Sequence, residues 1–218
     1  MVKVKICGVT TIEDALISAE ADMLGLNFYK PSPRYIEPQK AREMTDKLRE
    51  RLGDDCPVLV GVFVNESAEN ISSTMDIVGL DFAQLSGDER PEMLNELGSK
   101  AFKAIRPADM EAALRDVDVY GNGTIHCAPT ILVDAYHPNL YGGTGEQTNV
   151  DVALAIKSKT ERMMLAGGLT PQNVGERVRE IGPWGVDVAS GVEVDGLPGI
   201  KDADKIKAFI DVVRNMEK

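Results

Sequence analysis

Two side chains of different chemistry stand at the ends of apolar segments. Cys7 ends the segment that starts at Val2, and Asp134 ends the segment that starts at Thr130. A carboxyl group after a buried strand is costly unless it carries a proton or meets a partner, so Asp134 is the best single candidate for proton transfer. Cys7 would be a proton-transfer partner of a different type. Two other interpretations stay open, because aspartate also caps turns and a free cysteine is often a small buried hydrophobic residue.

Glycine-rich turns follow Asp134 and two later apolar segments. They read Tyr-Gly-Gly-Thr-Gly at 141–145, Leu-Ala-Gly-Gly-Leu at 165–169 and Ser-Gly-Val-Glu at 190–193. Backbone N–H groups without a side chain beside them can approach an anion, and the last loops of a β/α barrel commonly hold phosphate. Such turns also close loops that bind nothing. Their joint position favours a phosphate site at Gly143, Gly167, Gly168, Ser190 and Gly191.

A loop stiffened by Pro31 and Pro33 presents Arg34. The forked guanidinium suits a carboxylate, although a solvated surface arginine is the plainer interpretation. His126 and His137 stand without a matching ligand set, so we expect no metal site.

The elements that must position these residues alternate regularly. Eight short apolar segments, without hairpin turns between them, read as strands buried on both faces of a parallel sheet. They are 2–7, 23–28, 58–64, 80–85, 101–105, 130–134, 162–166 and 186–189. Helical patterns fill the gaps, with Thr10 or Thr11 as a cap of the first and Thr170 before Pro171 at the start of another.

Eight strand and helix units leave about 27 residues for each, close to the least that a barrel can use. We therefore predict an α/β fold, a single TIM (β/α)8 barrel over residues 1–218, with the doubly wound open sheet as the alternative. In a barrel the working residues follow the strands. The strand ends read Cys7-Gly8, Asn27-Phe28, Val64-Asn65, Gln84-Leu85, Arg106, Asp134, Gly167-Gly168 and Ser190-Gly191.

Composition excludes several partners. The net charge is −11, with no basic stripe, so nucleic acid is not expected. No apolar run is long enough for a membrane span, no signal-peptide pattern precedes the first strand, and three cysteines suit free thiols in a reducing compartment. We expect a cytoplasmic protein that acts on a small molecule. An anionic ligand must be captured locally, by arginine and backbone amides, against the overall charge.

The motifs occur in an order that resembles phosphoribosylanthranilate isomerase over nearly the whole chain. They are Lys5-Ile6-Cys7-Gly8, Ser32-Pro33-Arg34-Tyr35, Gln84-Leu85-Ser86-Gly87-Asp88-Glu89, Leu132-Val133-Asp134, Gly142-Gly143-Thr144-Gly145, Leu165-Ala166-Gly167-Gly168-Leu169 and Ser190-Gly191-Val192-Glu193. The resemblance implies a β/α barrel that performs an Amadori rearrangement in tryptophan biosynthesis, without a cofactor, as a monomer or homodimer.

The resemblance also implies roles. Asp134 would be the general acid that protonates the furanose ring oxygen, and Cys7 would be the general base that removes the C2 proton. Arg34 would hold the anthranilate carboxylate, and the glycine loops would hold the phosphate of the phosphorylated substrate.

Two stretches depart from the family pattern. Ser86 stands where the family usually has histidine, and Thr148-Asn149-Val150 replaces an aromatic, aspartate and tryptophan run. Asn149 can still cap the next helix. Two rivals remain: the sister sugar isomerase of histidine biosynthesis, including dual-substrate versions, which has a carboxylate at the position of Cys7, and a phosphate-binding barrel without catalysis.

Overall fold

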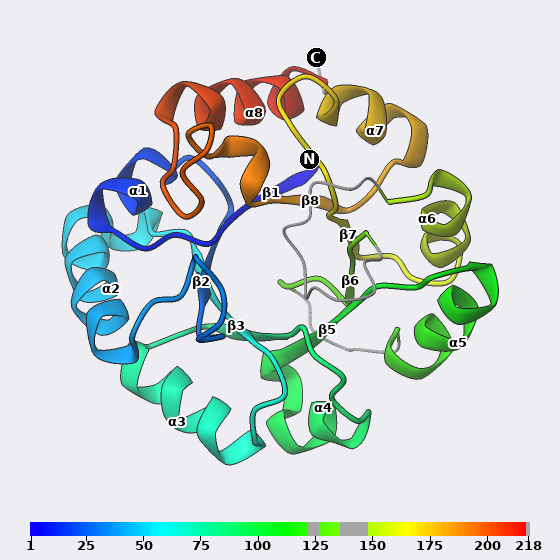
Figure 1. Cartoon of the computed structure of the whole chain (residues 1–218), viewed down its shortest axis with the longest axis horizontal. Coiled ribbons are helices and arrows are strands. Elements are labelled where there is room, and N and C mark those ends of the chain that lie inside the picture. Colours follow the sequence, from blue (N-terminus) through cyan, green and yellow to red (C-terminus); the bar gives the residue numbers. More distant parts are fainter. Residues whose placement is uncertain (122–126, 136–147, 217–218) are drawn as a thin grey trace.

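The computed structural model describes residues 1–121, 127–135 and 148–216. Eight parallel strands form one closed barrel in sequence order, and helices surround it (Figure 1). The barrel prediction is confirmed, and the open sheet is excluded because β1 pairs with both β2 and β8. The strands are β1 Lys3–Cys7, β2 Met23–Asn27, β3 Val58–Phe63, β4 Phe82–Leu85, β5 Ala101–Ile105, β6 Ile131–Val133, β7 Met163–Leu165 and β8 Gly185–Val188.

The outer helices follow the strands in turn. They are α1 Ile12–Ile17, α2 Pro38–Leu52, α3 Ala68–Val78, α4 Glu92–Leu97, α5 Met110–Tyr120, α6 Val150–Lys157, α7 Val174–Ile181 and α8 Ala203–Asn215, with short 3-10 turns at Gly53–Asp55, Gly98–Lys100 and Ser190–Val192. None of the helices in the described ranges is long and apolar enough to cross a membrane.

Capping chemistry explains where several helices begin. The Thr11 side chain accepts the N–H of Asp14 at the start of α1, and Asn149 accepts the N–H of Val152 at the start of α6. Of the two threonines predicted for the first cap, the structure selects Thr11, and the predicted cap at Asn149 is confirmed. The predicted helix start at Pro171 is wrong.

Helix α7 begins three residues after Pro171 because a turn comes first. The Asn173 side chain accepts the N–H of Thr170 and donates to the carbonyl of Gly168. The same side chain thereby fixes the glycine loop that follows β7, and the helix starts only at Val174.

Alternate residues of each strand belong to two different cores. On β6, Leu132 joins a cluster with Phe102 and Met164, whereas its neighbours Ile131 and Val133 pack in the larger cluster with helix residues. Since side chains alternate across a strand, the smaller cluster fills the barrel and the larger one lies between barrel and helices. Inward-facing residues near the carboxyl ends therefore meet at one mouth.

A buried lysine outside the barrel holds two of the mouth loops. Lys103 on β5 donates to the carbonyls of Leu85 (3.1 Å) and Gly87 (2.7 Å) and to Glu89 Oε2 (3.0 Å). Glu89 Oε1 in turn accepts the N–H groups of Asn65 and Gly87. The pair ties the loop after β3 to the loop after β4.

Replacing this lysine tests the contribution of the pair. Lys103→Met should lower the free energy of unfolding by about 3 to 5 kcal/mol, because the Glu89 carboxylate would lose its cation in a buried place. Urea unfolding measures the change. Lys207→Met, which breaks the exposed pair with Asp211, is the matched control and should be nearly neutral. Equal losses in the two variants would contradict this account of the loops.

Candidate active site

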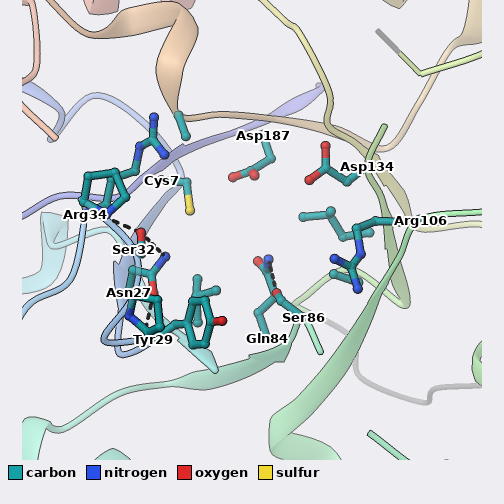
Figure 2. A pocket seen from close by; sticks show the side chains of 16 residues that line it. Cys7, Asn27, Tyr29, Ser32, Arg34, Gln84, Ser86, Arg106, Asp134 and Asp187 are labelled. Atoms are coloured by element: carbon teal, nitrogen blue, oxygen red, sulfur yellow. Dashed lines mark hydrogen bonds between the residues drawn. The ribbon is translucent and has the colours of Figure 1, made fainter. Parts of the chain in front are cut away.

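One cavity of about 240 Å³ opens at the mouth of the barrel. Cys7 and Asp134 line it from β1 and from the end of β6, and Arg34 borders it from the loop after β2 (Figure 2). The three residues are therefore brought together as the sequence predicted. Gln84, Arg106 and Asp187 complete most of its polar lining.

The Asp134 carboxyl group has an unusual acidity. Burial raises its pKa to about 6, the negative charge of Asp187 adds to the rise, and the N–H of Ala135 and the cation of Arg106 oppose it. The hydrogen bond from Ala135 is the local turn contact that the alternative interpretation expected. The side chain nevertheless lies in the cavity, and near neutral pH part of it keeps a proton that it can donate.

The Cys7 thiol lies inside the barrel and packs against Gly25 of β2. Removal from water raises its pKa, whereas the cations of Lys5 and Lys201 lower it and Asp187 raises it. Sγ would be only 2.8 Å from a Cβ built on Gly25, so this position on β2 has no room for a side chain. The geometry aims the thiol into the cavity, and burial keeps most of it protonated.

Arg34 is paired with a carboxylate of the protein itself, so it is not the solvated surface arginine of the plainer interpretation. Its Nε and Nη2 donate to the two oxygens of Glu193 at 2.7 and 2.8 Å, and Lys201 donates to the same carboxylate at 3.2 Å. Both partners are almost completely buried. The ion pair fixes the arginine at the cavity wall and leaves Nη1 outside the bidentate contact.

Gly8 allows this arginine to pack against the strand end. Its φ is +77°, in the left-handed region, and a Cβ built there would lie 2.5 Å from Arg34 Cδ.

The glycine loops after β7 and β8 touch each other. Gly167 and Gly168 have φ of +88° and +58°, and a Cβ on Gly191 would lie 1.9 Å from the carbonyl oxygen of Leu169. These glycines are required by backbone conformation and close approach, whether or not a ligand binds. Ser190 belongs to the same loop, after the cavity residue Ala189. Gly143 lies outside the described residues.

The two residues Ser86 and Thr148, which depart from the family pattern, make defined contacts in the structure. Ser86 is buried and accepts a hydrogen bond from Gln84 Nε2 at 3.0 Å, while Gln84 Oε1 finds no donor within the described part of the chain. Thr148 donates to the carbonyl of Ala166 and so anchors the start of α6 to β7. The described residues contain no group of three His, Cys, Asp or Glu that could hold a metal ion.

Several residues of the site carry no role that their sequence pattern alone predicts. Gln84 and Arg106 are among the predicted strand ends, and this position was the sequence signal that could have assigned them to the site. Lys5 was quoted only within a motif and Asp187 was not singled out. Lys5 lies two residues before Cys7, and Asp187 lies two residues before the cavity residue Ala189, so each faces the same way as that residue. Glu193 was quoted only as part of a motif.

Comparisons with known proteins show the family of this chain. The family model of N-(5'phosphoribosyl)anthranilate (PRA) isomerase matches residues 4–212. The chain belongs to this family. An N-(5'-phosphoribosyl)anthranilate isomerase of Trichlorobacter lovleyi is 41% identical over 212 residues, which cover 96% of this chain and 97% of the relative.

Solved structures of the family agree as well. The phosphoribosyl anthranilate isomerase of Thermotoga maritima has a TM-score of 0.85 at 34% identity, covering 99% of this chain and all of that one. A phosphoribosyl anthranilate isomerase in complex with reduced 1-(o-carboxyphenylamino)-1-deoxyribulose 5-phosphate has a TM-score of 0.82 at 33% identity, with the same coverage. The resemblance that the motifs carried is confirmed.

The perturbed carboxyl group gives a test of stability against pH. Because folding raises the pKa of Asp134, the folded state favours its protonated form, and stability is lost as pH rises from the ordinary pKa near 3.8 through about 6. Asp134→Asn should therefore be more stable than the wild type by an amount that grows over this window and then levels. Urea unfolding from pH 4 to 8 measures it. Asp76→Asn, on the exposed face of α3, is the control for the chemical change alone. A difference that is flat from pH 4 to 8 would contradict the perturbed carboxyl.

Proposed function

We propose that this chain, as one catalytic domain, converts N-(5-phosphoribosyl)anthranilate to 1-(2-carboxyphenylamino)-1-deoxyribulose 5-phosphate in tryptophan biosynthesis, with Asp134 as general acid and Cys7 as general base. The observation that carries the proposal is the shared cavity: a carboxyl group that holds a proton near neutral pH and a thiol line it together. Family membership supports the reaction, and the cavity supports the two roles.

The reaction divides into two proton transfers. Asp134 gives its proton to the furanose ring oxygen as the bond between that oxygen and C1 breaks, and the nitrogen lone pair forms an iminium with C1. The thiolate form of Cys7 then takes the proton on C2 and becomes the thiol, and the electrons of the C2–H bond form an enolamine, which tautomerises to the ketone. The positive iminium acidifies C2, which a base as weak as a thiolate requires.

Binding groups surround this pair. Arg34, anchored by Glu193, would hold the anthranilate carboxylate, and the amides of the loops at Gly143, Gly167, Gly168, Ser190 and Gly191 would hold the phosphate. Gln84 Oε1, a buried acceptor without a donor in the described residues, would accept a substrate hydroxyl or amine N–H. No step in this scheme calls for a cofactor.

One relative's structure supports a proposal on assembly, and the free thiols support one on location. One solved structure concerns monomers made from the dimeric isomerase of Thermotoga maritima. We propose a monomer or homodimer for this chain, in the cytoplasm, where a biosynthetic enzyme with free thiols would work.

The proton-transfer roles have a direct test. Cys7→Ala and Asp134→Asn should each lower kcat by about 10² to 10⁴, because each removes one proton-transfer group. The assay generates phosphoribosylanthranilate in situ and follows the decay of its fluorescence. Cys56→Ala, which changes a thiol that is not among the residues lining the cavity, is the matched control and should keep wild-type activity. If Cys7→Ala stays active, Cys7 is not the general base. If the wild type turns over only the histidine-pathway aminoaldose, the proposed substrate is wrong.

The role of Arg34 is tested by changing protein and substrate together. Arg34→Ala should chiefly raise KM for the anthranilate substrate, because the carboxylate loses its cation. The matching substrate made from aniline lacks that carboxylate. Its KM should already be high with the wild type and should change little in the variant. Equal losses on both substrates would show that the arginine acts through the shape of the site instead.

A further inference from the structure

A buried ion pair crosses the seam where the barrel closes. Lys5 on β1 and Asp187 on β8 are direct partners in the parallel pairing of these strands. Lys5 Nζ lies 2.7 Å from Asp187 Oδ1, and the lysine side chain is completely buried. Both side chains therefore point into the barrel, below its mouth.

The ammonium end of the pair lies beside the thiol. Lys5 and Cys7 are two residues apart on β1 and share its inner face. A Cβ built on Gly25 would lie 2.8 Å from Cys7 Sγ and 3.2 Å from Lys5 Nζ, so both atoms meet over the same glycine. No side chain at this position separates the thiol from the ammonium group.

The carboxylate end lies between the two reacting groups. Asp187 lines the cavity and projects between Cys7 and Asp134 (Figure 2). The pair is thus oriented, with its positive end at the proposed base and its negative end on the side of the proposed acid.

We propose that Lys5 and Asp187 form a positioning pair that sets the charge states of both reacting groups, its ammonium stabilising the thiolate of Cys7 and its carboxylate keeping Asp134 protonated. This inference rests on the acid and base roles proposed above. It concerns residues that need not touch the substrate.

The surrounding charges agree in sign with this arrangement. Desolvation raises the pKa of Cys7, and the cation of Lys5 is the largest influence in the opposite direction, ahead of Lys201. For Asp134, desolvation raises the pKa and Asp187 raises it further, against Arg106 and Lys5. Lys5 therefore favours the ionised form of Cys7, and Asp187 favours the protonated form of Asp134, although Asp187 also raises the pKa of Cys7.

The other charges at the mouth are already committed to partners. Arg34 and Lys201 both face Cys7, but both are paired with Glu193. Arg106 faces Asp134 and lies 3.8 Å from the carboxylate of Asp88.

A stabilising role alone would not call for these charges. Two ions buried inside a barrel lose their hydration, and well-packed apolar side chains of similar volume are often as stable or more stable. Met23 and Met164 show that this barrel interior accepts long apolar side chains. The ion pair therefore points to a function in the charge balance of the mouth.

Thiol alkylation gives a readout that needs no turnover. In a Cys56→Ser/Cys127→Ser background, only Cys7 reacts with iodoacetamide, and the midpoint of rate against pH reports its pKa. Lys5→Met should move the midpoint up, and Asp187→Asn should move it down. We expect about one pH unit in each direction, which is about tenfold in rate at a pH below the midpoint.

Asp134 supplies the second readout. The infrared band of its protonated carboxyl group is identified by its loss in Asp134→Asn. The titration of this band, with a midpoint near pH 6 in the wild type, should move to lower pH in Asp187→Asn because the neighbouring negative charge is gone.

Matched variants keep the test decisive. Lys103→Met breaks another buried lysine and carboxylate pair, on the outer side of β5, and should leave the Cys7 midpoint unchanged. If Lys5→Met does not fold, Lys5→Met/Asp187→Asn removes both charges and leaves neither one unpaired. Its difference from Asp187→Asn alone then gives the effect of the lysine.

Two outcomes would overturn the proposal. Midpoints that move in the same direction in both single variants, or that do not move, would reduce the pair to a structural contact. If the midpoints move in opposite directions but the wild type does not isomerise phosphoribosylanthranilate, the charge-setting pair stands and the proposed function falls. If the wild type is active but the midpoints do not move in the variants, the proposed function stands and the charge-setting pair falls.

Discussion

The pairing of β1 with β8 closes the barrel, and the chemistry at its mouth depends on this seam. It places Cys7, from the first strand, beside Asp187, from the last, although the two are distant in the chain. It also brings the buried side chain of Lys5 into hydrogen-bond contact with Asp187. An open sheet built from the same strands would leave these charges on opposite edges, unpaired. The charge balance at the cavity therefore depends on closure of the barrel.

Buried charges in this protein are balanced in small groups. Glu193 holds Arg34 and Lys201, Asp187 holds Lys5, and Glu89 holds Lys103. Because each carboxylate has a cation within hydrogen-bond distance, the cost of removing both from water is partly returned. The acidic surface can then repel anions in general, while the cavity offers a fixed cation and loop amides at close range.

The site also departs from what stability alone would favour. A carboxyl group whose pKa is raised to about 6 destabilises the folded state whenever it is ionised, and a buried thiol resists forming the thiolate that a base requires. Asp134 and Cys7 are thus held in an environment that works against their charged forms. This environment suits Asp134, because an acid must hold its proton. Cys7 must lose its proton to act as a base, and a nearby cation is needed to stabilise its thiolate.

Much of this molecule was readable from local sequence. Apolar runs, caps such as Thr11 and Asn149, and residues at strand ends determined the eight units and placed Cys7, Asp134 and Arg34 at one mouth, because these signals depend on neighbours a few residues apart. The start of α7 could not be read, since the side chain of Asn173 competes with the helix for the preceding turn.

Only the tertiary structure decided which charges are paired. Lys5 with Asp187 depends on the register across the closing seam, and Arg34 with Glu193 depends on two loops that meet above it. Register between distant strands is set by closure of the whole barrel, and no single segment of sequence carries that information.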